Sequence, residues 1–464
     1  MNQESKNYQP KKQLKQAEKR ICQNCGKEFT IEPEDFEFYE KIGVPAPTFC
    51  PDCRLQRRMM FRNERKLYKR KCDATGKDII SIYSPDKPYK VYDQKYWWSD
   101  KWDPMDYGRD YDWNKPFFEQ FKELRNNFPL MSLSNARATD SDYCNVNDKS
   151  KDCYLISASY ENERVFYSNR ITFNKDCMDL YIGNKNELCY ENVSCNNSYK
   201  LFFSRNSTNC LDSYFLYNCH NCQNCFGCVN LKNKQYCIFN KQYSKEEYFK
   251  KLKEFNLGSY RSLIELKKKF YRLYLGIPHK YSNISKSVDC SGDNLSNSKN
   301  CHSCFDIEAA ENCKFASWGG FGLKDSYDSG PGIGDNSELL YEVFDIVKDS
   351  SVYFSSVVYN SYNIQYSFNC YFSSHLFGCI GLRHKQYCIL NKQYTKEEYE
   401  KLVPKIIKHM NEHPYIDKKG RVYRYGEFFP PELSPFAYNE TIAQEYFPLT
   451  KEEAIEKGYQ WSDQ

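Results

Sequence analysis

An internal duplication is the strongest constraint on the fold of this 464-residue chain. Residues 226–250 match residues 377–401 at a constant offset of 151, and 18 of the 25 aligned positions are identical. Repetition over such a distance indicates that one large structural unit is built twice. We therefore look for a fold that the chain can form in two successive copies.

Within the first copy, short segments rich in Cys and aromatic residues recur at steps of ten to thirteen positions. Runs of four to six residues separated by Asn, Ser, Asp and Gly turns at this spacing indicate β-structure. Two steps make about 23 residues, the length of one coil of a parallel β-helix. We predict a mainly β fold with some α: two copies of a Cys-rich, parallel β-helix-like solenoid, joined and capped by short helices. Repeated β-sandwiches are the alternative. The segments begin near Tyr143, Cys153, Val165, Met178, Leu188, Lys200, Asp212, Cys225 and Gln235, and in the second copy near Val288, His302, Cys313, Asp325, Leu339, Val352, Ile364, Leu376 and Gln386.

Each copy ends in a pattern that is typical of a helix start. Ser244 with Glu247 and Thr395 with Glu398 fit the capping box, in which a Ser or Thr is followed by Glu three residues later. Between the copies, the apolar residues of 263–273 recur at steps of three and four, which predicts an amphipathic helix.

Four cysteines near the N-terminus have the spacing of a metal site. Cys22 and Cys25 form one C-x-x-C pair, and Cys50 and Cys53 form a second, separated from the first by 24 residues. Structural zinc is bound by four soft ligands in a tetrahedron, and each C-x-x-C turn presents two thiolates together. We predict one structural Zn²⁺ at these four residues. Because all four ligands are cysteines, no coordination position remains for catalysis.

The same segment resembles a known family, the zinc-ribbon (treble-clef) domain of bacterial proteins. The shared pattern joins Cys22-x-x-Cys25-Gly26-x-x-Phe29 to Cys50-Pro51-x-Cys53-Arg54 and covers about 35 residues. The larger organisation is similar to Cys- and aromatic-rich proteins of candidate-phylum bacteria. This resemblance implies zinc binding and a treble-clef module, and carries over no established activity.

The excess positive charge of the chain lies in its N-terminal sixth. Residues 1–72 contain 17 Lys or Arg against 10 Asp or Glu, whereas the whole chain has a net charge of +5. We read 54–67 as a helix with many cations, which could contact nucleic acid or an acidic partner, with a solvated helix face as the alternative. The candidate contact residues are Arg54, Arg57, Arg58, Arg62, Arg65 and Lys69.

A second group of cysteines could also be read as a metal site. Cys219, Cys222, Cys225 and Cys228 follow one another at steps of three. In the duplicated copy, Ser373 replaces Cys222 and Leu376 replaces Cys225, so the shared unit does not require four ligands. We expect these cysteines to be buried packing residues, because a free Cys behaves as a small hydrophobe.

These patterns predict a division of the chain into consecutive parts. The predicted parts are a basic disordered tail (1–20), the zinc module with its basic helix (21–72), an aromatic-rich connecting module (73–130), the first solenoid copy (131–243), a helical linker (244–280), the second copy (281–394), a capping helix (395–413), and a C-terminal arm rich in aromatic residues and Pro with a short helix (414–464).

We expect a zinc-binding protein that recognises partners rather than an enzyme. No nucleophile motif, carboxylate pair or small-molecule site stands out, and apolar runs are shorter than the ~18 residues of a membrane span. The first 20 residues are polar and Lys-rich, unlike a secretory signal, so we expect the cytoplasm, where cysteines stay reduced. A β-helix enzyme acting on a polysaccharide and a structural scaffold are the alternatives.

Overall fold

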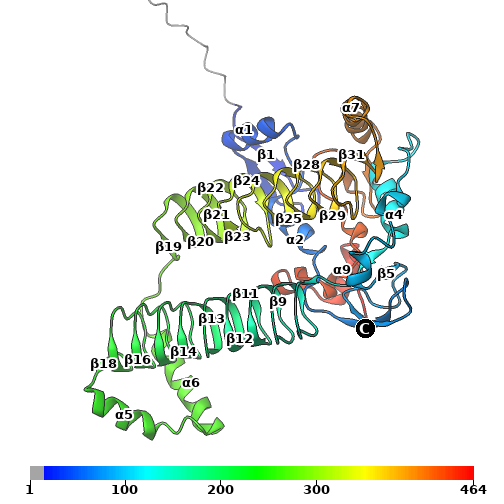
Figure 1. The fold of residues 1–464 in the computed structure, drawn as a ribbon. Helices are drawn as coiled ribbons and strands as arrows, with labels where there is room; N and C mark the ends of the chain where they lie inside the picture. Colours follow the sequence, from blue (N-terminus) through cyan, green and yellow to red (C-terminus); the bar gives the residue numbers. More distant parts are fainter. Residues whose placement is uncertain (1–14, 464) are drawn as a thin grey trace, which may run out of the picture. The chain divides into compact units, whose positions relative to one another are not determined.

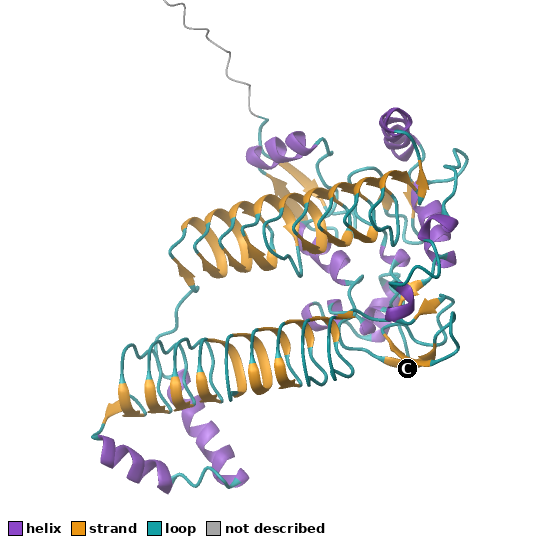
Figure 2. Ribbon diagram, viewed as in Figure 1, coloured by secondary structure: helices purple, strands orange, loops and turns teal. Residues whose placement is uncertain are grey.

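The computed structural model describes residues 15–463. These residues form a mainly β structure with additional helices, and most strands lie in two large sheets with parallel neighbours (Figures 1 and 2). The mainly β class is therefore confirmed. The described residues group into two compact units that are discontinuous in sequence: unit 1 contains those of 1–62, 103–128 and 282–464, and unit 2 contains 63–102 and 129–281.

Unit 2 contains one of the large sheets, which we call the first coiled segment. Its strands follow one another along the sheet nearly in sequence order (Figure 1). They are β7 (Asn135–Ala136), β8 (Asn145–Asp148), β9 (Ser157–Tyr160), β10 (Glu163–Phe166), β11 (Asn169–Thr172), β12 (Lys175–Asn184), β13 (Tyr190–Asn196), β14 (Tyr199–Phe202), β15 (Leu211–Tyr214), β16 (Gln223–Phe226), β17 (Gln235–Ile238) and β18 (Lys241–Gln242).

The register of this sheet defines the length of a coil. Asn145 pairs with Ser157, Ser157 with Asn169, and Asn169 with Tyr181, each time in parallel and at a constant step of twelve positions. The chain thus returns to a neighbouring position after each such step. The predicted coil of about 23 residues is wrong, because one step of the sequence rhythm is already a full coil. Parallel pairing also contradicts the sandwich alternative, whose sheets are antiparallel.

A three-residue rhythm explains so short a coil. Residues with positive φ recur at every third position from Asp140 to Asn224, although such backbone angles are uncommon outside Gly. The residue after each of them is buried, as at Cys144, Asn147 and Ser150. Each coil therefore buries four side chains, and the narrow interior favours Cys, Ser, Asn and aliphatic residues.

Buried polar side chains in this interior bind the backbone of the next coil. The backbone nitrogen of Asn174 donates to Oδ1 of Asn162 at 3.0 Å, and that of Asn186 donates to Oδ1 of Asn174 at 3.0 Å. Buried polar groups need such partners, since each unpaired group costs free energy. The Asn-rich composition thus stabilises the stack of coils.

Unit 1 contains the other large sheet, the second coiled segment. Its pairings advance by the same step of twelve from Ser350 to Tyr362 and from Tyr362 to Ser374. Its strands are β19 (Ile284–Ser285), β20 (Val288–Ser296), β21 (Lys299–Glu308), β22 (Glu311–Lys314), β23 (Ser317–Phe321), β24 (Lys324–Ser329), β25 (Glu338–Val347), β26 (Ser350–Tyr353), β27 (Ser356–Tyr359), β28 (Tyr362–Gln365), β29 (Phe368–Tyr371), β30 (Ser374–Phe377), β31 (Gln386–Ile389) and β32 (Lys392–Gln393).

The predicted helix starts after each copy are confirmed. Helix α5 (Lys245–Glu254) has a capping box at Ser244 and Glu247, and α7 (Lys396–Glu412) has one at Thr395 and Glu398. The amphipathic stretch between the copies forms α6 (Tyr260–Leu275).

The remaining elements lie outside the two large sheets. In unit 1 they are β1 (Glu18–Ile21), β2 (Glu28–Ile31), α1 (Pro33–Ile42), α2 (Pro51–Met59), η1 (Pro104–Tyr107), α4 (Phe117–Asn127), β33 (Tyr415–Ile416), β34 (Val422–Tyr423), η2 (Pro431–Leu433), η3 (Tyr438–Glu440), α8 (Ala443–Tyr446) and α9 (Lys451–Glu456), and in unit 2 they are β3 (Tyr68–Lys71), β4 (Asp78–Ser81), β5 (Val91–Tyr92), α3 (Gln94–Trp97) and β6 (Leu130–Met131).

The predicted N-terminal tail, residues 1–20, lies mostly outside the described residues. Its last residues form the start of strand β1. Among residues 15–463, no helix combines the length and the apolar character that a membrane crossing requires.

Candidate metal centre

The first two cysteines lie in the turn of the hairpin β1–β2. The backbone nitrogen of Cys22 donates to the carbonyl of Lys27, and that of Gly26 donates to the carbonyl of Cys22, both at 2.9 Å. Gly26 has a φ of 73°, a left-handed angle that Gly adopts without steric cost. This tight turn presents the thiols of Cys22 and Cys25 on one side of the hairpin.

The other two cysteines lie at the start of helix α2. Cys50 is the N-cap residue with extended backbone angles, and Pro51 occupies the first helical position, where its missing N–H costs nothing. Cys53 follows within the first turn, so both thiols are near the N-terminus of the helix. The partial positive charge at a helix N-terminus favours thiolates there.

All four sulfur atoms converge. Every pair of Sγ atoms among Cys22, Cys25, Cys50 and Cys53 lies within 4.8 Å, and the Cys25–Cys50 pair is 3.8 Å apart. Two sulfur ligands that each lie about 2.3 Å from a tetrahedral metal are about as far apart as Cys25 and Cys50 are here. Three of the four cysteines are buried and Cys25 is exposed. The cluster could hold a metal ion, as the spacing predicts.

Hydrogen bonds couple three of the four thiols. The pKa of Cys22 is lowered because the thiols of Cys50 and Cys53 donate hydrogen bonds to its sulfur. The hydrogen bond to Cys22 in turn raises the pKa of Cys50 to about 11. The lowered pKa favours the thiolate of Cys22, which is the form that binds metal ions.

Residues around the cluster orient its ligands. The side-chain nitrogen of Asn24 donates to Sγ of Cys53 at 3.2 Å, and Arg421 donates to Oδ1 of Asn24 at 2.7 Å. Gln23 exchanges two hydrogen bonds with the backbone of Val422, at 2.8 and 3.0 Å. The cysteine cluster is thus held against β34, which lies near the other end of the sequence.

Helix α2 is shorter than predicted and its arginines are buried. The helix ends at Met59 instead of continuing to residue 67. Arg54, Arg57 and Arg58 are at most 1% exposed, and Arg62 is 5% exposed. The expectation that these four residues face a partner is corrected, because their guanidinium groups lie inside unit 1. Arg65 and Lys69, both in unit 2, are exposed.

The three arginines of α2 pair with three buried carboxylates. Arg54 lies 2.8 Å from Asp328, Arg57 lies 2.6 Å from Glu342, and Arg58 lies 3.1 Å from the other oxygen of Glu342. Three positive charges thus face carboxylates on β24 and β25 of the second coiled segment.

The third carboxylate belongs to Glu427, which links this ion-pair network to the cysteine cluster. Arg57 donates to Glu427 at 3.0 Å, and its guanidinium carbon lies 4.1 Å from the centre of the Phe49 ring. The backbone nitrogen of Thr48, two residues before Cys50, donates to the other oxygen of Glu427 at 2.8 Å. With this residue the network contains three cations and three anions, so its charge is balanced.

Sequence reasoning missed these three acidic partners. Asp328, Glu342 and Glu427 all lie far from α2 along the chain. The spacing of the arginines carried a signal: Arg54, Arg57 and Arg58 stand at steps of three and four and share one face of the helix, and a cationic face that packs into the protein needs buried partners.

The later cysteines adopt a different arrangement. Cys219, Cys222, Cys225 and Cys228 are buried at successive inward positions of a single coil in unit 2. Each thiol donates to the carbonyl two residues earlier, at 3.3–3.5 Å. Among the described residues, the N-terminal four are the group whose ligand atoms converge closely enough for one ion.

A third N-terminal motif lacks its second cysteine. Cys72 and Gly76 form the turn between β3 and β4, with the same backbone bonds as the turn of Cys22. Cys72 is buried, and its sulfur accepts a hydrogen bond from the backbone of Asp93 at 3.2 Å. The chain thus repeats the geometry of the first cysteine turn with a single cysteine.

Comparisons with known proteins do not identify a family. No protein-family model matches the chain, and no curated protein does either. The solved structure of the UDP-N-acetylglucosamine acyltransferase from Campylobacter jejuni aligns with 64% of this chain and 98% of its own, at 8% identity and a TM-score of 0.10. So low a score supports no argument about fold or function.

Proposed function

We propose that Cys22, Cys25, Cys50 and Cys53 bind one structural Zn²⁺ in a treble-clef module. A hairpin turn supplies two ligands and a helix N-terminus supplies the other two, which is the arrangement expected of that module. Four thiolates suit zinc, and they complete its tetrahedron without a position for substrate. A bound zinc ion would supply folding energy here rather than chemistry.

The role we propose for this module is to fasten distant parts of unit 1 together. The carrying observation is that α2 holds two of the metal ligands in its first turn, while its three arginines pair with β24, β25 and Glu427. Metal binding fixes one end of the helix and the ion pairs fix its body. The protein is then a zinc-stabilised scaffold for binding partners.

We further propose that the two coiled segments are duplicated parallel β-helix solenoids. The support is the constant offset of 151 in sequence, together with the twelve-residue register of the first sheet and of residues 338–389 in the second. Extended solenoids bury each coil against its neighbours and offer long surfaces for recognition.

We still propose nucleic acid or an acidic protein as a partner, but fewer candidate contact residues now support this. With four arginines buried, Arg65 and Lys69 are the candidate contact residues that remain exposed. If they bind phosphates, affinity for RNA or duplex DNA should fall as the salt concentration rises.

Elemental analysis of the purified protein tests the metal proposal. We expect about one zinc per chain in the wild type and a loss of most of it in Cys25→Ser and Cys53→Ser. Cys237→Ser is the matched control, because Cys237 lies in a coil interior and should leave the zinc content unchanged. Iron, or several metal ions per chain, would contradict the proposal.

A further inference from the structure

Two neighbouring rows of side chains run along the outside of the first coiled segment, and we call them the aromatic face. In the first row, parallel register places Phe166 beside Met178, Phe202 beside Tyr214, and Tyr214 beside Phe226. The second row follows one position later along the chain, at steps of twelve. Its members are Tyr143, Leu155, Tyr167, Asp179, Glu191, Phe203 and Phe215.

Helix α6 covers the C-terminal part of this face. Leu266 of α6 is buried together with Phe215 and Phe226, and the ring of Phe270 lies 5.9 Å from that of Phe215. The aromatic face is therefore a surface that binds an amphipathic helix within this chain.

A lysine at the edge of α6 completes that interface. Nζ of Lys267 lies 2.5 Å from a carboxylate oxygen of Glu191 and 4.7 Å from the centre of the Phe203 ring. The helix thus packs apolar residues against the aromatic rows and pairs its lysine with Glu191 of the second row.

Beyond Glu191, the same rows continue without this cover. Leu155 is 39% exposed, Tyr167 is 52% exposed and Met178 is 37% exposed. Contiguous exposed apolar groups of this kind commonly mark an interaction site. Asp179, which lies twelve positions before Glu191 in the second row, is exposed. Partial burial and the charge of Glu191 raise the pKa of Asp179, so a nearby cation would stabilise its carboxylate.

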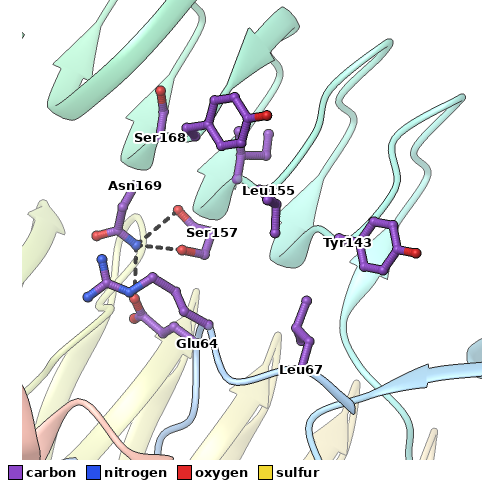
Figure 3. A pocket seen from close by; sticks show the side chains of 10 residues that line it. Glu64, Leu67, Tyr143, Leu155, Ser157, Ser168 and Asn169 are labelled. Atoms are coloured by element: carbon purple, nitrogen blue, oxygen red, sulfur yellow. Dashed lines mark hydrogen bonds between the residues drawn. The ribbon is translucent and has the colours of Figure 1, made fainter. Parts of the chain in front are cut away.

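A cavity of about 210 Å³ lies at the end of the uncovered stretch (Figure 3). Tyr143, Leu155 and Leu67 line its apolar side. On its polar side, the side-chain nitrogen of Asn169 donates to Glu64 at 2.9 Å and to the hydroxyl of Ser157 at 2.7 Å. The cavity could receive one apolar side chain of a molecule that lies on the face.

We propose that the uncovered part of the aromatic face binds an amphipathic, lysine-bearing helix of a protein partner. Continuity with the α6 interface carries this proposal, because the same rows already bind such a helix from Glu191 onward, one coil away from Asp179. Asp179 supplies the charge that the lysine of the partner would meet, as Glu191 does for Lys267. Amphipathic helices bind in this way through residues spaced three and four apart.

A peptide with the sequence of residues 259–276, which contains α6, provides the probe. It carries a fluorescent label and is added to the full-length chain, and binding is followed by fluorescence anisotropy. We expect saturable binding that weakens at least tenfold in Tyr167→Ala and in Asp179→Lys. A peptide in which Glu replaces the lysine of position 267 should bind poorly to the wild type and regain affinity for the Asp179→Lys variant.

Two control variants distinguish binding at the proposed surface from nonspecific binding elsewhere on the chain. Glu161→Lys reverses an exposed carboxylate in the row of Phe173, away from the proposed surface, and should leave the affinity of the peptide unchanged. Phe173→Ala, at a residue 44% exposed in another row, should also have no effect. Circular dichroism confirms that each variant is folded. Absent binding, binding equally strong in every variant, or binding that Glu161→Lys weakens as much as Asp179→Lys does would overturn the proposal.

Discussion

Asp349 is a buried acid at a position where neighbouring coils have serine. It is 2% exposed, between Ser337 and Ser361 in an inward row with steps of twelve. The backbone nitrogen of Ser361 donates to Oδ1 of Asp349 at 2.5 Å. Burial nevertheless raises the pKa of Asp349 to about 8, because desolvation disfavours the charged form.

Replacing Asp349 with Asn should therefore stabilise unit 1 at alkaline pH. An unfolded Asp titrates near pH 4, so the folded state binds more protons between about pH 4 and pH 8, and stability falls as the pH rises through that window. One pKa unit corresponds to about 1.4 kcal/mol, so the gain at pH 8.5 could reach several kcal/mol. We expect the melting temperature of Asp349→Asn to exceed that of the wild type at pH 8.5 by more than at pH 5.

Thermal unfolding at the two pH values measures this difference. Asp110→Asn, at a side chain 79% exposed, is the control and should shift the melting temperature equally little at both. A destabilisation by Asp349→Asn at pH 8.5 would show that the carboxylate is needed in its charged form.

At the scale of single elements, α2 depends on its buried ion pairs. Arg57 contacts both Glu342 and Glu427, and all three side chains are at most 5% exposed. Removing one partner of a buried pair leaves the other charged and unpaired, which costs about 3–5 kcal/mol. The ion pairs thus fix the position of the helix more than they add to total stability.

We expect Arg57→Ala to lower the free energy of unfolding by about 3–5 kcal/mol. The double variant Arg57→Ala/Glu427→Ala should be less destabilised than the sum of the two single variants, because neither charge is then left alone. Denaturant titration measures all three. Lys41→Ala, which breaks an exposed pair with Asp325, should cost at most about 1 kcal/mol. Additive losses in the double variant would mean that the two residues act independently.

The same elements show how far the sequence could be read. The cysteine cluster was predictable because C-x-x-C spacing is local, and so were the capping boxes of α5 and α7. The burial of Arg54, Arg57 and Arg58 was not predictable, because it depends on carboxylates that are distant in sequence and come close only in the folded chain. The recurrence of Cys and aromatic segments was evident in the sequence, but the period alone does not show whether each segment is half a coil or a whole coil. The positive φ angles at every third residue make a whole coil of twelve residues possible.

At the scale of the whole molecule, each unit has a core of its own. The buried cluster of unit 1 includes Leu340, Ile346 and Val358, and that of unit 2 includes Val165 and Leu201. All four cysteines of the candidate metal centre belong to unit 1. Loss of metal should therefore weaken one unit and spare the other.

Differential scanning calorimetry with and without a strong zinc chelator tests this separation. We expect two transitions, and the chelator should lower the melting temperature of one by more than about 5 °C while the other stays within about 1 °C. Cys53→Ser without chelator should reproduce the shifted trace. A single transition, or two that move together, would contradict independent units.

The register of the coils also governs how such a protein can change in length during evolution. A gain or loss of twelve positions adds or deletes one entire layer and leaves every interior side chain in the interior. A change of three positions preserves the inside–outside pattern but shifts the following layers by a quarter of their circumference. Changes of one or two positions need a local irregularity, as in the second coiled segment, where some neighbouring strands are offset by 11, 13 or 14 positions. Length variants within the regular first coiled segment should therefore differ by multiples of twelve.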